Sequence, residues 1–78
     1  MQSTQTITKT LLVGNLHPTL EPGVLRRVFE GIGPVLSLDL LNDGFAFVAM
    51  NADHAAQARR RLHGTRLSGE LMLIDEGF

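Results

Sequence analysis

The chain has 78 residues, enough to enclose one hydrophobic core and too few for two independent domains. Hydrophobic residues make up 44% of it and charged residues 19%, a balance that is typical of a globular domain and excludes an intrinsically disordered chain. It has no cysteine, which excludes a disulfide framework and a cysteine-ligated zinc site, and its formal net charge of -1 provides no long-range attraction for polyanions.

The N-terminal residues 1–8 are polar and rich in threonine, so we expect a flexible leader before a single domain over residues 9–76. No apolar run approaches the length of a membrane span and no signal-peptide pattern begins the chain, which favours a soluble intracellular fragment of a larger protein. A first strand is predicted over residues 9–16 from the alternation of its side chains. Its core-facing residues are Leu11 and Val13, and its outward residue is Leu12.

A helix is predicted over residues 20–32, because apolar residues recur there at the spacing of one helical face, namely Leu25, Val28, Phe29 and Ile32. Thr19 is a candidate N-cap, Pro22 fits the first turn, and Gly33-Pro34 should end the helix. A strand follows over residues 35–41, with an inner face formed by Leu36, Leu38 and Leu40.

The turn Asn42-Asp43-Gly44 predicts a tight hairpin, which makes the strands on either side antiparallel neighbours. In the strand that follows, Phe45 and Phe47 fall on one face. The other face is formed by Ala46, Val48 and Met50. Because one face must be core, the opposite face presents two aromatic rings.

A second helix is predicted from Asp53, its candidate N-cap, to about His63, with Gly64 as its stop and a buried side formed by Ala55, Ala58 and Leu62. Residues 67–70 form a turn and residues 71–75 a last strand. The order strand, helix, strand, strand, helix, strand predicts an α+β fold of the ferredoxin-like type. In that fold a four-stranded antiparallel sheet carries two helices packed on one face.

Two of these segments carry motifs in the right order. Leu11-Leu12-Val13-Gly14-Asn15-Leu16 is similar to the hexamer motif, and Gly44-Phe45-Ala46-Phe47-Val48 to the octamer motif, of the RNA recognition motif (RRM) family. The resemblance implies that Phe45, Phe47 and Leu12 form an open platform on which bases of single-stranded RNA stack, assisted by Asn15 and Lys9. It further implies a binding module of a larger nuclear RNA-processing protein, with no cofactor.

Three features depart from the pattern of that family. Leu12 replaces a third aromatic ring, Asp43 stands where a basic residue usually pairs with phosphate, and the acidic pair Asp75-Glu76 follows the last strand. The open face is therefore expected to be apolar with an acidic fringe. RNA binding should be weak and should depend only weakly on salt, since few phosphates are neutralised.

The same departures favour a rival function, in which the domain binds a protein partner or a second copy of itself. The apolar interface for such a partner would consist of the platform residues together with Leu41, Leu71 and Leu73. A further surface is the arginine-bearing helix, either a solvated face or a docking site for an acidic partner, with Arg59, Arg60 and Arg61. Arg59 stands where the family usually has an aliphatic core residue, so it extends from the helix edge or pairs with a buried acid. The C-terminal Phe78 could also fold back over the rings.

Metal binding and enzymatic catalysis find no support in the sequence. No two of its three histidines have the spacing of four residues that places two ligands on one helix face, and no serine lies near a recognisable base. We therefore expect no metal site, no enzymatic activity and no membrane association.

Overall fold

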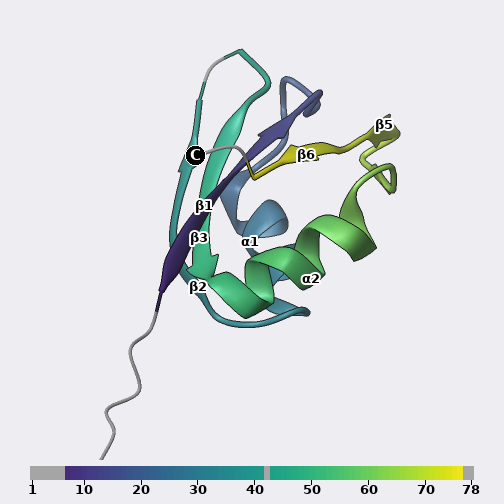
Figure 1. Cartoon of the computed structure of the whole chain (residues 1–78). Helices are drawn as coiled ribbons and strands as arrows, with labels where there is room; N and C mark the ends of the chain where they lie inside the picture. Colours follow the sequence, from purple (N-terminus) through teal and green to yellow (C-terminus); the bar gives the residue numbers. More distant parts are fainter. Residues whose placement is uncertain (1–6, 42, 77–78) are drawn as a thin grey trace, which may run out of the picture.

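The computed structural model describes residues 7–41 and 43–76. In chain order its elements are β1 Thr8–Gly14, α1 Pro22–Glu30, β2 Val35–Leu40, β3 Ala46–Asn51, α2 Ala52–Leu62, β4 Arg66–Leu67, β5 Glu70–Leu71 and β6 Leu73–Asp75 (Figure 1). One antiparallel sheet has the order β2-β3-β1-β6, and β4 and β5 form a separate small hairpin. Both helices lie on one side of the four-stranded sheet (Figure 1), which confirms the predicted ferredoxin-like fold.

The hydrophobic core lies between this sheet and the two helices. The sheet contributes Leu11, Val13 and Val48, all fully buried, and α1 contributes Leu25 and Phe29. On α2 the buried residues are the small Ala55 and Ala58, which lets this helix pack close to the sheet. Burying one large apolar side chain stabilises a fold by about 1.5–3 kcal/mol, so this cluster supplies the main favourable term. No helix in the described part of the chain is long and apolar enough to cross a membrane.

Both predicted N-caps are wrong. α1 begins after Glu21, whose side chain makes no capping hydrogen bond, while the Thr19 amide donates to Nδ1 of His17 over 3.1 Å. Pro22 at the first helical position has no amide that would need a cap. At α2 the cap is Asn51, whose side chain accepts a hydrogen bond from the Asp53 amide over 3.3 Å. The cap is displaced because β3 runs directly into α2, so the last residue of the strand caps the helix.

The inner face predicted for the second strand is also partly wrong. Val35 pairs with Met50 while Ser37 pairs with Ala49, so Leu36 is an extra residue at a β-bulge. Leu36 is 54% exposed, and Val35 fills the core position in its place. The bulge shifts the alternation of side chains by one residue at the start of β2.

The predicted last strand, residues 71–75, is divided into two elements. Leu71 pairs with Arg66 in the β4–β5 hairpin, and only Leu73–Asp75 joins the main sheet as β6. Ser68 and Gly69 both have positive φ, 53° and 87°, which fits the tight two-residue turn of this hairpin. At the other end, β1 begins at Thr8, the last residue of the predicted leader; residues 1–6 and Phe78 lie outside the described residues.

Candidate nucleic-acid interface

The sheet face opposite the helices carries side chains in rows that run across the strands. The register aligns Asp39, Phe47, Leu12 and Asp75 in one row, from β2 to β6. Residues directly opposite each other in a sheet point to the same face, so Phe47 and Leu12 share this surface. The next row contains Gly14 opposite Leu73, with Phe45 on the other side of Gly14. The predicted alternation of Phe45 and Phe47 against Ala46, Val48 and Met50 is confirmed, since all three of the latter are buried.

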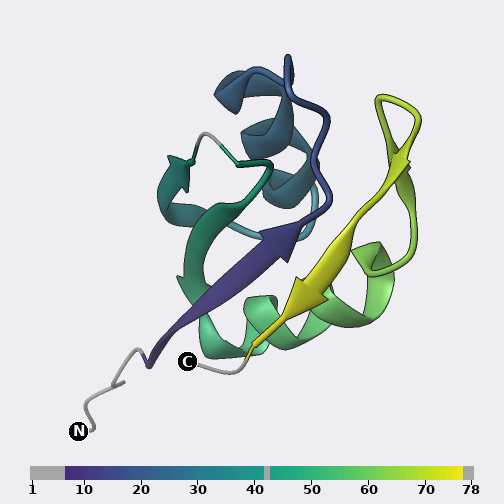
Figure 2. The same ribbon diagram turned by 90° about the horizontal axis from the view of Figure 1, so that it is seen from above.

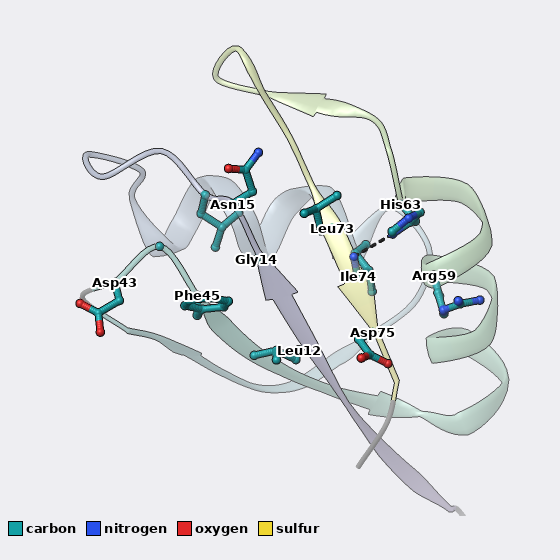
Figure 3. Close-up of a pocket in the computed structure, with 12 residues that line it drawn as sticks. Leu12, Gly14, Asn15, Asp43, Phe45, Arg59, His63, Leu73, Ile74 and Asp75 are labelled. Carbon is teal, nitrogen blue, oxygen red and sulfur yellow. Dashed lines mark hydrogen bonds between the residues drawn. The ribbon is translucent and has the colours of Figure 1, made fainter.

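The Phe45 ring lies on the backbone of the neighbouring strand at Gly14 (Figure 3). A Cβ atom at residue 14 would stand 3.0 Å from Cε1 of the ring, so a glycine is what allows this close approach. The backbone leading to the ring is held by the turn: Gly44 has a φ of 82°, and its carbonyl accepts a hydrogen bond from the Leu16 amide over 3.0 Å. The ring remains 42% exposed. A side chain positioned in this way offers a flat apolar surface to a ligand.

A hollow of about 780 Å³ lies over this ring and continues across β6 towards α2. Its volume falls within the range of about 300–1,000 Å³ that small-ligand sites occupy. Leu12, Gly14, Phe45 and Leu73 supply its apolar surface. Its charged residues lie at separate places: Asp43 beyond Phe45, Asp75 on β6 and Arg59 on α2 (Figure 3).

Asn15 also lines the hollow, in the loop that follows β1. It has a positive φ of 62°, and its Nδ2 donates a hydrogen bond to the carbonyl of Leu71 over 2.9 Å. This bond ties the loop to the β4–β5 hairpin, which extends away from the sheet in Figure 2. One amide group of the site is therefore already oriented before a ligand binds.

Lys9, which was also predicted to bind RNA, does not lie on the sheet face that carries Phe45 and Phe47. It pairs with Met50, which is fully buried, and it shares its side of β1 with Leu11 and Val13. Alternation therefore places Lys9 on the helix side of the sheet. The sequence pattern contained this information, because Lys9 lies an even number of residues from Leu11.

The residues predicted for a protein interface are divided between several places. Leu41 and Leu73 flank the Phe45 row and are 43% and 51% exposed, whereas Leu71 lies in the β4–β5 hairpin. Arg60 and Arg61 are exposed on α2 and do not line the hollow, but Arg59 does. Arg59 extends from the helix edge and pairs with no buried acid, since no described polar or charged residue is buried.

Sequence reasoning placed Arg59 with the helix faces remote from the platform. The signal that could have found it is its spacing: Arg59 follows the buried Ala55 by four residues and precedes His63 by four. His63 accepts a hydrogen bond at Nδ1 from the Ile74 amide of β6 over 2.9 Å (Figure 3). One side of α2 therefore borders the edge strand. The described residues contain no group of three side chains that could hold a metal ion.

The sequence profile of the family described as the RNA recognition motif matches residues 11–73. RNA-binding protein 4B of Homo sapiens and RNA-binding protein 4 of Mus musculus are each 43% identical over 65 residues, which cover 82% of this chain and 18% of the relative. The chain thus spans less than a fifth of the length of these relatives. A crystal structure of the first two RRM domains of yeast poly(U)-binding protein superposes with a TM-score of 0.84 at 26% identity, over 100% of this chain and 52% of that one.

Proposed function

This chain belongs to the RNA recognition motif family of RNA-binding modules, and we propose that it binds short single-stranded RNA by stacking bases on Phe45 and Phe47. The family is not one of enzymes, and the chain is an RNA-binding module without catalytic activity. Leu12, which lies next to Phe47 in the same row, would be an apolar contact for a base or sugar, and Asn15 would supply a polar group elsewhere on the lining of the hollow.

The observation that carries this proposal is the Phe45 ring over Gly14. The ring is exposed on a sheet face that neither α1 nor α2 covers and borders a hollow large enough for a ligand. Stacking of a base on an aromatic side chain contributes about 1–3 kcal/mol and accepts any base, because every base has a π face. Affinity would therefore come from the rings, and base preference from groups such as Asn15 and Asp75 at the border.

We expect the affinity of the isolated domain to be low. Asp39, Asp43 and Asp75 are exposed on or beside the open face, and each would repel a phosphate at low ionic strength. Useful binding would then require neighbouring modules of a longer, nuclear RNA-processing protein, whose linked sites raise the effective concentration.

The test is an amide-resolved NMR titration of the labelled domain with random-sequence short single-stranded RNA. Shifts at Leu12, Asn15, Phe45 and Phe47 are expected, with little change at core residues of the helix side. Silence at these four residues up to millimolar RNA would refute the proposal.

Exposed leucines beside the same ring favour a second candidate function, binding of a protein partner or a second copy of the domain. Leu41, Phe45 and Leu73 lie in one strip across the sheet, with Gly14 between Phe45 and Leu73, and each of the three is more than 40% exposed. Leu71 and the arginines of α2 would extend that surface. A dilution series of the protein alone distinguishes the candidates, because self-association moves the amides of this strip without RNA.

A further inference from the structure

The hollow beside Phe45 does not end at the edge of the sheet. It is lined by Leu73, Ile74 and Asp75 of β6 and then by Arg59 and His63 of α2. In Figure 3 Arg59 lies beyond β6, on the opposite side of the hollow from Asp43. A ligand that occupies the whole hollow therefore extends from the Phe45 ring across the edge strand to the helix.

The charge along this path changes sign. Asp43 stands at the Phe45 end, Asp75 on β6, and Arg59 at the α2 end. Among the described residues that line the hollow, Arg59 is the only lysine or arginine. An RNA strand carries a negative charge at every nucleotide, so its backbone is disfavoured near the aspartates and favoured near Arg59.

The guanidinium group of Arg59 also makes no ion pair or hydrogen bond with another described side chain. The ion pair found in the described part of the chain joins Arg26 to Glu30, and no hydrogen bond of Arg59 to another described side chain is present. A guanidinium group presents several N–H donors in a planar fork that fits phosphate. The neighbouring His63 is different, because its Nδ1 already accepts the Ile74 amide.

On the basis of the proposed RNA binding, we propose that Arg59 holds a phosphate of the bound RNA where the strand leaves the sheet across the β6 edge. Bases stacked on Phe45 would then be anchored at one side by the helix. The RNA backbone would then pass over the β6 edge next to Arg59, because Arg59 carries the positive charge at the border of the hollow.

The helix supplies a matched control in Arg60. Successive helical residues point about 100° apart, and Arg60 follows a direction away from the Ala55 and Ala58 side. Arg60 is exposed and does not line the hollow. Arg59→Gln and Arg60→Gln remove the same charge from adjacent positions, so the difference between them reports the local contact and not the overall field.

The experiment measures binding of a fluorescein-labelled pool of short random-sequence RNA to the wild-type domain and both variants over a range of salt concentrations. We expect Arg59→Gln to weaken binding about three- to fivefold at low salt, as for an exposed ion pair. Its slope of log affinity against log salt should be smaller by about 0.7, the value for one phosphate contact on a single strand. Arg60→Gln should leave both quantities close to those of the wild type.

Equal effects of the two variants, or no effect of either, would overturn the assignment of Arg59. In either case Phe45→Ala tests the proposed function separately. If Phe45→Ala loses RNA binding and Arg59→Gln does not, RNA still stacks on Phe45 and only the contact with Arg59 is refuted. A wild-type domain that binds no RNA overturns both proposals together.

Discussion

The ring of Phe45 lies against Gly14 so closely that a Cβ atom at residue 14 would stand 3.0 Å from its Cε1 atom. Gly14 is the last residue of β1 and Phe45 directly precedes the adjacent strand β3, so the contact places the ring over the end of β1. The orientation of the proposed stacking surface therefore depends on the absence of a side chain at a neighbouring position.

Gly14→Ala should displace the ring and weaken RNA binding several-fold while changing stability little. The new methyl group forces the ring to move by a few tenths of an ångström, and an exposed ring can do so without opening the core. RNA titration and chemical denaturation of the variant measure the two effects separately.

Gly23→Ala in α1 is the control for that substitution. A Cβ atom there meets nothing within 4 Å, and replacement of a helical glycine by alanine stabilises by up to about 1 kcal/mol. Gly23→Ala should therefore keep RNA affinity and raise or preserve stability. Unchanged affinity in Gly14→Ala would show that the position of the ring is not important for binding.

Phe45→Ala should abolish most RNA binding with a small loss of stability. Removal of one stacked base contact costs about 1–3 kcal/mol, a factor of roughly 5 to 150 in affinity. The ring is 42% exposed, so its truncation leaves no buried cavity. Leu36→Ala, at the exposed bulge of β2, is a matched control that removes an apolar side chain outside the hollow and should bind RNA as the wild type does.

The order of the elements and the two faces of the Phe45 strand could be predicted because they depend on local alternation and on one hairpin turn. The bulge at Leu36 could not, since an extra residue in a strand depends on how β2 meets β3 and leaves no local signal. For a similar reason the sequence pattern does not predict that Arg59 lies near the platform residues. Its place at the border of the hollow follows from the packing of α2 beside β6, which brings Arg59 to the same hollow as Gly14 and Phe45.

Asn51→Ala should destabilise the domain by about 1 kcal/mol through loss of the α2 cap, as measured by chemical denaturation. Asp53→Ala should cost less, because Asp53 contributes its backbone amide to that cap and only an exposed first-turn charge from its side chain. A larger loss for Asp53→Ala would show that the aspartate is the true cap.

Asp43→Lys should strengthen RNA binding, because it replaces a charge that repels phosphate at the Phe45 end of the hollow by one that attracts it. The expected gain is several-fold at low salt and should decline as salt is added, since both residues are exposed to screening. Glu21→Lys makes the same change in net charge directly before α1, at a residue that does not line the hollow. An equal gain in RNA affinity in Glu21→Lys would mean that the net charge of the domain controls binding. A gain confined to Asp43→Lys would place the RNA backbone within reach of the turn before Phe45 as well as of Arg59.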